Sequence, residues 1–201
     1  MVLYFDVGDV LVKDCMHLKF PLLAAKYGLE LADLQQTRKK YRPLADAGKI
    51  SDPEFWQLCL QDLGIKAQPE DWQLDSCYQE VPGVRGIVLA LKAQGHRLAI
   101  ISDDSREMAE NRRRRWGYDG VFDRVIISSD LGITKPDERI FLHALKTMQS
   151  QPAESLFIDN LEYNLQGAAR VGMRTLLFTN ADQLQDDLNR MGLLDPGSGT
   201  V

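Results

Sequence analysis

Five short apolar runs lie along the chain, and each has the length of one buried strand. They cover residues 2–5, 97–101, 124–128, 155–158 and 174–178. Short apolar runs without polar alternation are typical of strands that are covered on both faces. The pattern therefore predicts a five-stranded sheet with a layer of structure on each side.

Helical spacing separates the later runs. In residues 83–94, 136–148 and 161–171 the apolar positions recur every three or four residues, as on one face of a helix. Pro136 is placed for the first turn of its helix, where proline is favoured. Strands that alternate with helices at this rhythm predict right-handed crossovers and a parallel sheet. The predicted fold class is α/β, a doubly wound, Rossmann-like parallel sheet.

The interval 14–80 interrupts this alternation. Its apolar residues follow helical stripes, and Ser51 with Glu54 has the pattern of a helix N-cap and capping box. An all-helical segment directly after the first strand is typical of a lid over the active edge of a sheet. We therefore predict a catalytic core formed by residues 1–13 and 81–201, and a small helical cap formed by the segment between them.

The composition is that of an ordinary globular protein, because 44% of the 201 residues are hydrophobic and 26% are charged. The net charge of −5 gives no reason to expect affinity for nucleic acid. No apolar stretch approaches the roughly 20 residues that span a bilayer, and no basic segment opens the chain. Three widely spaced cysteines are predicted to be reduced thiols. We expect a cytoplasmic protein that binds neither nucleic acid nor membranes, and leave monomer and homodimer open.

Polar side chains stand where the predicted strands end. Asp6 follows the first run, Ser102 the second and Asp159 the fourth. Lys135 stands just before a predicted helix, where a cation gains nothing from the helix dipole. Taken singly, these residues are also typical of a turn, an N-cap or a solvated surface. Together they predict an active site, because α/β folds bind ligands outside the carboxyl ends of their strands.

In this order the four segments resemble the motifs of the haloacid dehalogenase superfamily, most of whose members are phosphatases. The resemblance implies that Asp6 is a nucleophile that forms an aspartyl-phosphate, and that Ser102 hydrogen-bonds the phosphoryl oxygens. It also implies that Lys135 offsets the charge of the neighbouring acids, and that Asp159 and Asn160 form the fourth motif. The inserted helical segment is similar to the cap found in one branch of the family.

The same resemblance implies a Mg²⁺ cofactor and a small phosphorylated substrate. The implied metal ligands are Asp6, the backbone carbonyl of Gly8, Asp159 and Asn160. The implied substrate-binding residues are Ser102, Asp103 and Lys135. Residues 6–12 and 48–51 are similar to bacterial phosphatases that act on glucose 1-phosphate, which favours a sugar phosphate as the substrate.

The chain departs from the family pattern at two positions. Most family phosphatases carry a second Asp where this chain has Gly8, and that Asp protonates the leaving group. General acid–base help is worth roughly 10²–10⁴ in rate, so Asp9 or a residue of the cap is expected to replace it, or else activity is reduced. Asn160 stands where an acid is common, so one negative charge is missing and weaker Mg²⁺ binding is expected.

Two other functions remain alternatives to the phosphatase. A 2-haloacid dehalogenase needs neither metal nor the second Asp, but Asp103 stands where those enzymes use an Asn to cradle the departing halide, and an anion would repel it. Their fourth-motif pattern is also replaced, by Asp159, Leu161 and Asn164. The other alternative is a catalytically impaired binding protein, against which the retention of all four motifs argues.

Several further features are predicted to be structural. Residues 112–115 are four consecutive arginines, which point in different directions on a helix and are interpreted as a solvated helix end. His96 and His143 have no metal-ligand spacing and are predicted to be structural. His17, near the start of the cap, is a weaker candidate for a residue that faces the substrate.

Overall fold

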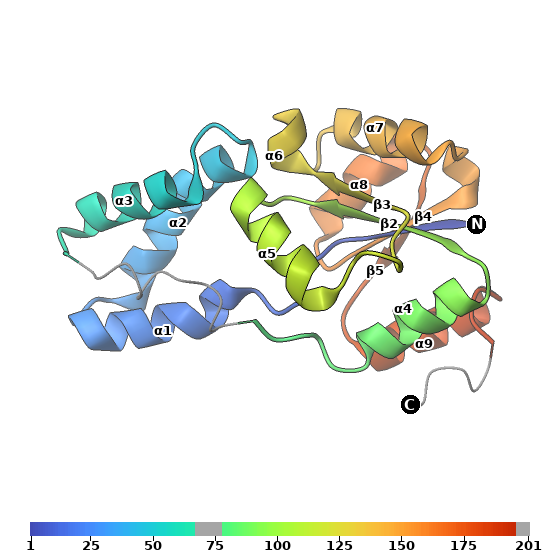
Figure 1. The fold of residues 1–201 in the computed structure, drawn as a ribbon, viewed down its shortest axis with the longest axis horizontal. Coiled ribbons are helices and arrows are strands. Elements are labelled where there is room, and N and C mark those ends of the chain that lie inside the picture. The colour runs from blue at the N-terminus through green and yellow to red at the C-terminus, as the bar shows by residue number, and fades with distance from the viewer. Residues whose placement is uncertain (67–77, 196–201) are drawn as a thin grey trace.

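The protein is built on one sheet of five parallel strands in the order β3-β2-β1-β4-β5 (Figure 1). The computed structural model describes residues 1–66 and 78–195. The strands are β1 (Val2–Phe5), β2 (Arg97–Ser102), β3 (Arg124–Ile127), β4 (Ser155–Asp159) and β5 (Arg174–Leu177). Each predicted run agrees with its strand to within one residue at either end. The predicted α/β fold with a parallel sheet is confirmed.

Alternate residues of the central strand β1 pack on opposite faces of the sheet. Leu3 and Phe5 join one apolar cluster, and Val2 and Tyr4 join the other. Helices α4 (Val84–Ala93) and α9 (Ala181–Arg190) cover the first face, and α7 (Glu138–Met148) and α8 (Glu162–Arg170) cover the second (Figure 1). Burial of both faces explains why the strand sequences are continuously apolar.

The helix after the third strand begins later than its sequence suggested. Asp137 is its N-cap, and the Asp137 carboxylate accepts a hydrogen bond from the backbone N–H of Arg139 at 2.9 Å. Pro136 therefore lies before the helix, and the expectation that it occupies the first turn is wrong. The side chain of Asp137 caps the helix, which removes the need for proline to begin it.

The inserted segment contains three helices, α1 (Cys15–Tyr27), α2 (Leu31–Asp46) and α3 (Asp52–Leu63). They enclose an apolar cluster of their own, to which α5 (Arg106–Trp116) contributes Met108. Ser51 caps α3 with both hydrogen bonds of a capping box to Glu54, as predicted. This separate cluster supports the proposed division into a core and a cap, although part of segment 14–80 lies outside the described residues.

The chain enters and leaves the insert through two adjacent segments. The backbone N–H of Lys13 donates to the carbonyl of Gln79 at 2.8 Å, and that of Val81 donates to the carbonyl of Leu11 at 3.0 Å. The insert is therefore tied to the sheet at the carboxyl end of β1, and in Figure 1 its helices lie on the side toward which β1 runs. This places α1 and α2 beside the predicted active edge.

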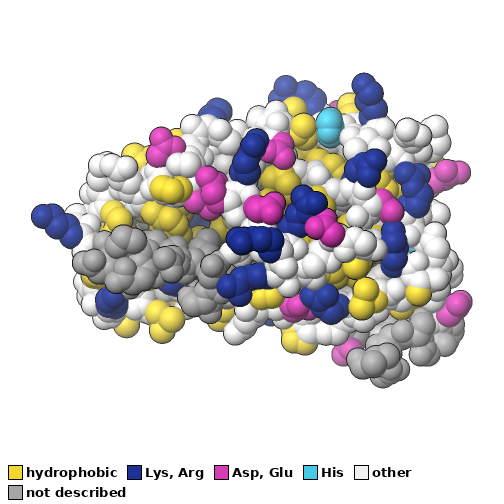
Figure 2. Space-filling model, in the orientation of Figure 1, with side chains coloured by type: hydrophobic (Ala, Val, Ile, Leu, Met, Phe, Trp, Pro, Cys, Tyr) yellow, Lys and Arg dark blue, Asp and Glu magenta, His cyan; other side chains and the backbone are white. Residues whose placement is uncertain are grey.

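Charged side chains of both signs share the molecular surface. On the face shown in Figure 2, Lys and Arg side chains are interspersed with Asp and Glu. Exposed ion pairs include Arg106–Asp130, Arg113–Asp119 and Arg139–Asp137. In the part of the chain that the structure describes, no helix combines the length and hydropathy that a membrane span requires.

Candidate active site

A pocket of about 420 Å³ lies at the carboxyl ends of the central strands, between the sheet and the insert. Six of the seven predicted site residues line it: Asp6, Gly8, Ser102, Asp103, Lys135 and Asn160. The seventh, Asp159, is fully buried beneath them and reaches the pocket through its bond to Lys135. The fold therefore brings all seven residues to one place.

The Lys135 ammonium joins the ends of three strands. Its Nζ lies 2.5 Å from Asp6 Oδ1 and 3.0 Å from Asp159 Oδ2, and it donates to the carbonyl of Ile101 at 3.2 Å. The Lys135 side chain is only 2% exposed, so these contacts replace nearly all of its hydration. Two buried carboxylates this close together require a cation, because removal of one partner leaves an uncompensated buried charge.

The ionisation of this cluster follows from burial and from opposite charge. Burial raises the pKa of Asp6 to about 7, although the attraction of Lys135 opposes the rise and the repulsion of Asp159 adds to it. Burial by itself would lower the pKa of Lys135, but attraction to Asp6 and Asp159 outweighs it and raises that pKa above its ordinary value. Lys135 therefore stays charged while a carboxylate is beside it.

Ser102 is held by a neighbour that the sequence did not single out. Its hydroxyl donates to Asp104 Oδ2 at 2.8 Å, and both carboxylate oxygens of Asp104 accept from Arg112 Nη1 at 2.8 Å. Both Ser102 and Asp104 are 1% exposed. A phosphate that receives a hydrogen bond from Ser102 must therefore compete with Asp104 for the proton, a constraint that the motif alone does not reveal.

Arg112 does not belong to a solvated helix end, and that expectation is wrong. Its side chain is 8% exposed and lines the pocket. Met108, Arg112 and Trp116 are buried on one face of α5, and their spacing of four residues was the signal that could have revealed this. The neighbouring Arg113 behaves as predicted for a surface residue and pairs with Asp119.

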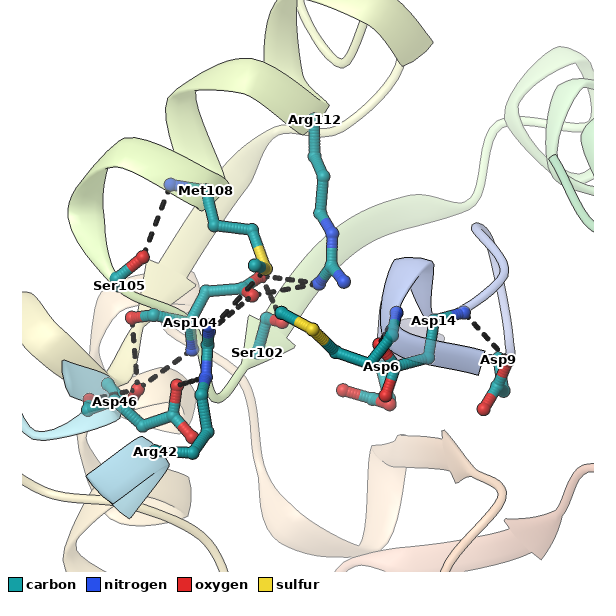
Figure 3. A network of polar contacts seen from close by, with 12 residues as sticks. Asp6, Asp9, Asp14, Arg42, Asp46, Ser102, Asp104, Ser105, Met108 and Arg112 are labelled. Carbon is teal, nitrogen blue, oxygen red and sulfur yellow. Dashed lines mark hydrogen bonds and ion pairs between the residues drawn. The ribbon is translucent and has the colours of Figure 1, made fainter. Parts of the chain in front are cut away.

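Two residues of α2 reach the same network from the insert. Figure 3 shows Arg42 and Arg112 approaching Asp104 from opposite sides. Arg42 Nη2 lies 3.5 Å from Asp104 Oδ1, and Arg42 Nε lies 2.6 Å from Asp46 Oδ1. The hydroxyl of Ser128 donates to the backbone carbonyl of Asp46 at 2.6 Å. Arg42 and Asp46 are four residues apart, a spacing that is typical of an exposed ion pair on a helix. Their burial therefore could not be predicted from the sequence.

The amide of Asn160 offers an oxygen that the protein leaves unused. Asn160 Oδ1 is buried without a hydrogen-bond partner in the described structure. The oxygens of Asp159, by contrast, accept from the backbone N–H of Leu161 at 2.8 Å, from Asn164 Nδ2 at 2.9 Å and from Lys135. An unpartnered buried oxygen on a residue that lines the same pocket as Asp6 suits a hard cation, because Mg²⁺ prefers oxygen ligands.

Asp103 lines the same pocket and contacts the backbone of Lys135. Its Oδ1 accepts the backbone N–H of Lys135 at 3.0 Å, which ties the second and third motif segments together. Burial raises the pKa of Asp103, although attraction to Lys135 opposes this. Through this hydrogen bond Asp103 helps to position Lys135. Asp103 also lines the pocket, but its carboxylate offers no positive charge to a bound anion.

A second group of polar residues lies at the entrance to the insert. Asp9, Asp14 and His17 line the pocket, and one ligand atom of each lies within 4.8 Å of the others. Figure 3 shows Asp9 and Asp14 on the far side of Asp6 from the Asp104 network. The sequence alone left His17 as a weak candidate, because its isolated position matches no motif.

The chain matches the family model of haloacid dehalogenase-like hydrolases over residues 5–172. A curated relative, the glyceraldehyde 3-phosphate phosphatase of Pyrococcus abyssi, is 35% identical over 195 residues, which cover 88% of this chain and 80% of the relative. The (S)-2-haloacid dehalogenase 1 of a Pseudomonas species is 27% identical over 150 residues, which cover 69% of this chain and 65% of the relative.

Solved structures share the fold. An enzyme of the haloacid dehalogenase family from Bacteroides thetaiotaomicron matches with a TM-score of 0.75 at 18% identity, over 92% of this chain and 97% of that one. The same enzyme has been solved in complex with magnesium and inorganic phosphate. At this identity the likeness concerns the fold alone, but the family model spans most of the chain. The protein therefore belongs to the haloacid dehalogenase-like hydrolases.

Proposed function

We propose that the protein is a Mg²⁺-dependent phosphatase that hydrolyses a small sugar phosphate. The observation that carries the proposal is the contact of one buried lysine, Lys135, with both Asp6 and Asp159 at the floor of a polar pocket. The glyceraldehyde 3-phosphate phosphatase that is 35% identical to this chain supports the same class of reaction.

The proposed reaction begins at Asp6. One Asp6 oxygen attacks phosphorus while the P–O bond of the ester breaks and the sugar departs, which leaves an aspartyl-phosphate. Water then hydrolyses this intermediate to phosphate and restores the Asp6 carboxylate. Lys135 neutralises part of the charge that gathers between the carboxylate and the phosphoryl oxygens, and the Ser102 hydroxyl donates a hydrogen bond to one of those oxygens. In the structure Asp104 accepts this hydrogen bond, so a bound phosphate would replace Asp104 as the acceptor.

The donors present fit a divalent cation. Asp6, the carbonyl of Gly8 and the unpartnered Asn160 Oδ1 would hold it, all three through oxygen. When bound, Mg²⁺ supplies positive charge that lowers the repulsion between carboxylate and phosphate. The oxygens of Asp159 already have protein donors, so we assign Asp159 to the orientation of Lys135 and Asn164.

The pocket wall favours a hydroxyl-rich leaving group. Arg38 pairs with Asp14 at 2.6 Å, Arg42 with Asp46, and Arg112 with Asp104, so each guanidinium group of the wall has a carboxylate partner. Paired carboxylates and guanidinium groups present both acceptors and donors, which match the hydroxyl groups of a sugar. The volume of about 420 Å³ lies within the usual range of small-molecule sites.

The test is a phosphatase screen with the wild-type protein, with and without Mg²⁺. The substrates are glucose 1-phosphate, glyceraldehyde 3-phosphate, p-nitrophenyl phosphate and acetyl phosphate. We expect metal-dependent release of phosphate and its loss in Asp6→Asn, with Asp119→Asn as the matched surface control. Full turnover by Asp6→Asn would overturn the proposed nucleophile.

The screen also separates the two alternatives. Absence of turnover on p-nitrophenyl phosphate and acetyl phosphate, whose leaving groups need no acid, would favour a binding protein. Metal-independent release of halide from a 2-haloacid would favour a dehalogenase. Asp103 beside the phosphate position argues against the latter, because a carboxylate there repels a departing halide.

A further inference from the structure

The position that would hold a general acid beside Asp6 is a glycine with room around it. A Cβ added to Gly8 would meet only Asp6 Oδ2, at 3.9 Å, which is an ordinary van der Waals contact. The chain therefore lacks a proton donor there although the space exists. An alkoxide is a poor leaving group, so the hydrolysis of a sugar phosphate is faster when another residue of the pocket supplies a proton.

His17 is placed to supply that proton. It lies in the first turn of α1 and lines the same pocket as Asp6. Its Nδ1 lies 3.7 Å from Asp9 Oδ2, and 69% of its side chain is exposed, so a ligand in the pocket can reach the ring. Histidine is the side chain that most often exchanges protons with substrates near neutral pH.

Asp9 is fixed by the turn that follows β1. Its Oδ1 accepts the backbone N–H of Asp14 at 2.9 Å, and its own N–H donates to the carbonyl of Val12 at 2.7 Å. Its φ of 55° is in the left-handed region, which non-glycine residues rarely adopt. Such conformations concentrate at functional sites, because the surrounding structure must hold them. Here the conformation leaves Oδ2 of Asp9 on the side of His17.

A metal ion is a weaker explanation for this group. Asp14 Oδ1 caps α1 by accepting the backbone N–H of Met16 at 3.0 Å, and Asp14 Oδ2 receives Arg38 at 2.6 Å. A cation bound between these residues would have to displace or repel the Arg38 guanidinium. One carboxylate at 3.7 Å from a histidine nitrogen, beside a second carboxylate that is already paired, instead favours an acid–base residue that a neighbouring charge orients.

We propose that His17, oriented by Asp9, is the proton donor that replaces the acid absent at Gly8; this rests on the proposed phosphatase function. As the Asp6 oxygen forms its bond to phosphorus, the P–O bond of the ester breaks and its electron pair moves to the leaving oxygen, which takes the proton from His17. The neutral imidazole then accepts a proton from the water that attacks the aspartyl-phosphate. Phosphate and the Asp6 carboxylate are released, and His17 is protonated again.

The experiment compares leaving groups. For His17→Ala and His17→Gln we expect kcat on the preferred sugar phosphate to fall about 10²–10⁴-fold, and kcat on p-nitrophenyl phosphate to fall less than about tenfold. Asp9→Asn, which changes a positioning residue, should show the same selectivity in kcat with KM nearly constant. The matched control is His143→Ala, which removes an exposed histidine from α7. Gly8→Asp in the His17→Ala background should restore turnover of the sugar phosphate.

The possible outcomes distinguish failure of the His17 proposal from failure of the proposed phosphatase function. Equal losses on the two substrates, or no loss on the sugar phosphate, would show that His17 is not the acid while leaving the phosphatase intact. Failure of Gly8→Asp to restore any activity, with Gly8→Asp alone active, would also count against it. A wild-type protein that hydrolyses no phosphate ester would reject both proposals together. Normal far-UV circular dichroism of each variant is required before its kinetics are compared.

Discussion

Arg42 of the insert and Asp104 of the core form an ion pair at the wall of the pocket, with Arg42 Nη2 3.5 Å from Asp104 Oδ1. Asp104 also pairs with Arg112 and accepts a hydrogen bond from the Ser102 hydroxyl. A side chain of the insert therefore contacts the residue that accepts a hydrogen bond from Ser102, the hydroxyl that we propose binds phosphate. This relationship links the position of α2 to the chemistry at the strand ends, and it explains why so many charged groups can be buried together.

Arg112 should matter far more than its neighbour in the arginine run. We expect Arg112→Met to lower the free energy of unfolding by about 3–5 kcal/mol, because it leaves Asp104 buried with less compensating charge. Urea denaturation measures the change. Arg113→Met is the matched control on the same helix, and it should alter stability little because its pair with Asp119 is exposed. Similar losses in both variants would contradict the burial of Arg112.

Asp46 should make stability depend on pH. Burial raises its pKa from 3.8 to about 7, and Arg42 only partly opposes this. Between these two pKa values the folded protein holds a proton on Asp46 that the unfolded chain has lost. The contribution of Asp46 to the free energy of unfolding therefore falls as pH rises from about 4 to about 7. We expect Asp46→Asn to lose less stability than the wild type between pH 5 and pH 8, measured by urea denaturation. Parallel changes in the two proteins would show that Asp46 does not titrate in this way.

Gly167 should tolerate no side chain. A Cβ there would lie 2.4 Å from the carbonyl oxygen of Pro136 and 2.8 Å from the ring of Phe141, so α8 packs directly on the segment that carries Lys135. We expect Gly167→Ala to cost about 1–3 kcal/mol of stability and to reduce turnover by shifting Lys135. Gln166→Ala, at the exposed neighbouring position, is the control. Thermal unfolding and steady-state kinetics measure both effects, and a stable, fully active Gly167→Ala would contradict this packing.

Asn160 should set the Mg²⁺ requirement. We expect Asn160→Asp to lower the Mg²⁺ concentration at half-maximal activity several-fold, because it adds a negative charge to an oxygen donor set. Asn160→Leu should raise that concentration, since it removes the unpartnered Oδ1. Isothermal titration with Mg²⁺ provides a readout that does not depend on turnover. An unchanged Mg²⁺ dependence in both variants would remove Asn160 from the ligand set.

Much of the site could be predicted because its residues occupy the ends of predictable strands. Asp6, Ser102 and Asp159 each follow a run of buried apolar residues, and parallel strands bring their carboxyl ends to one edge. Lys135 stands in a loop, and only its place in the order of motifs indicated that it would join them. In the structure Lys135 contacts both Asp6 and Asp159.

The sequence by itself determined the five strands, their parallel arrangement and the group of acids at their ends, because burial on both faces and local turn chemistry act over a few neighbouring residues. Only the tertiary structure decided which charged residues join the site. Arg42, Asp104 and Arg112 look like ordinary polar residues in the chain, yet all three are buried. Their burial depends on partners brought together from distant segments, and the energy of a buried charge is set by those partners and not by its neighbours in sequence.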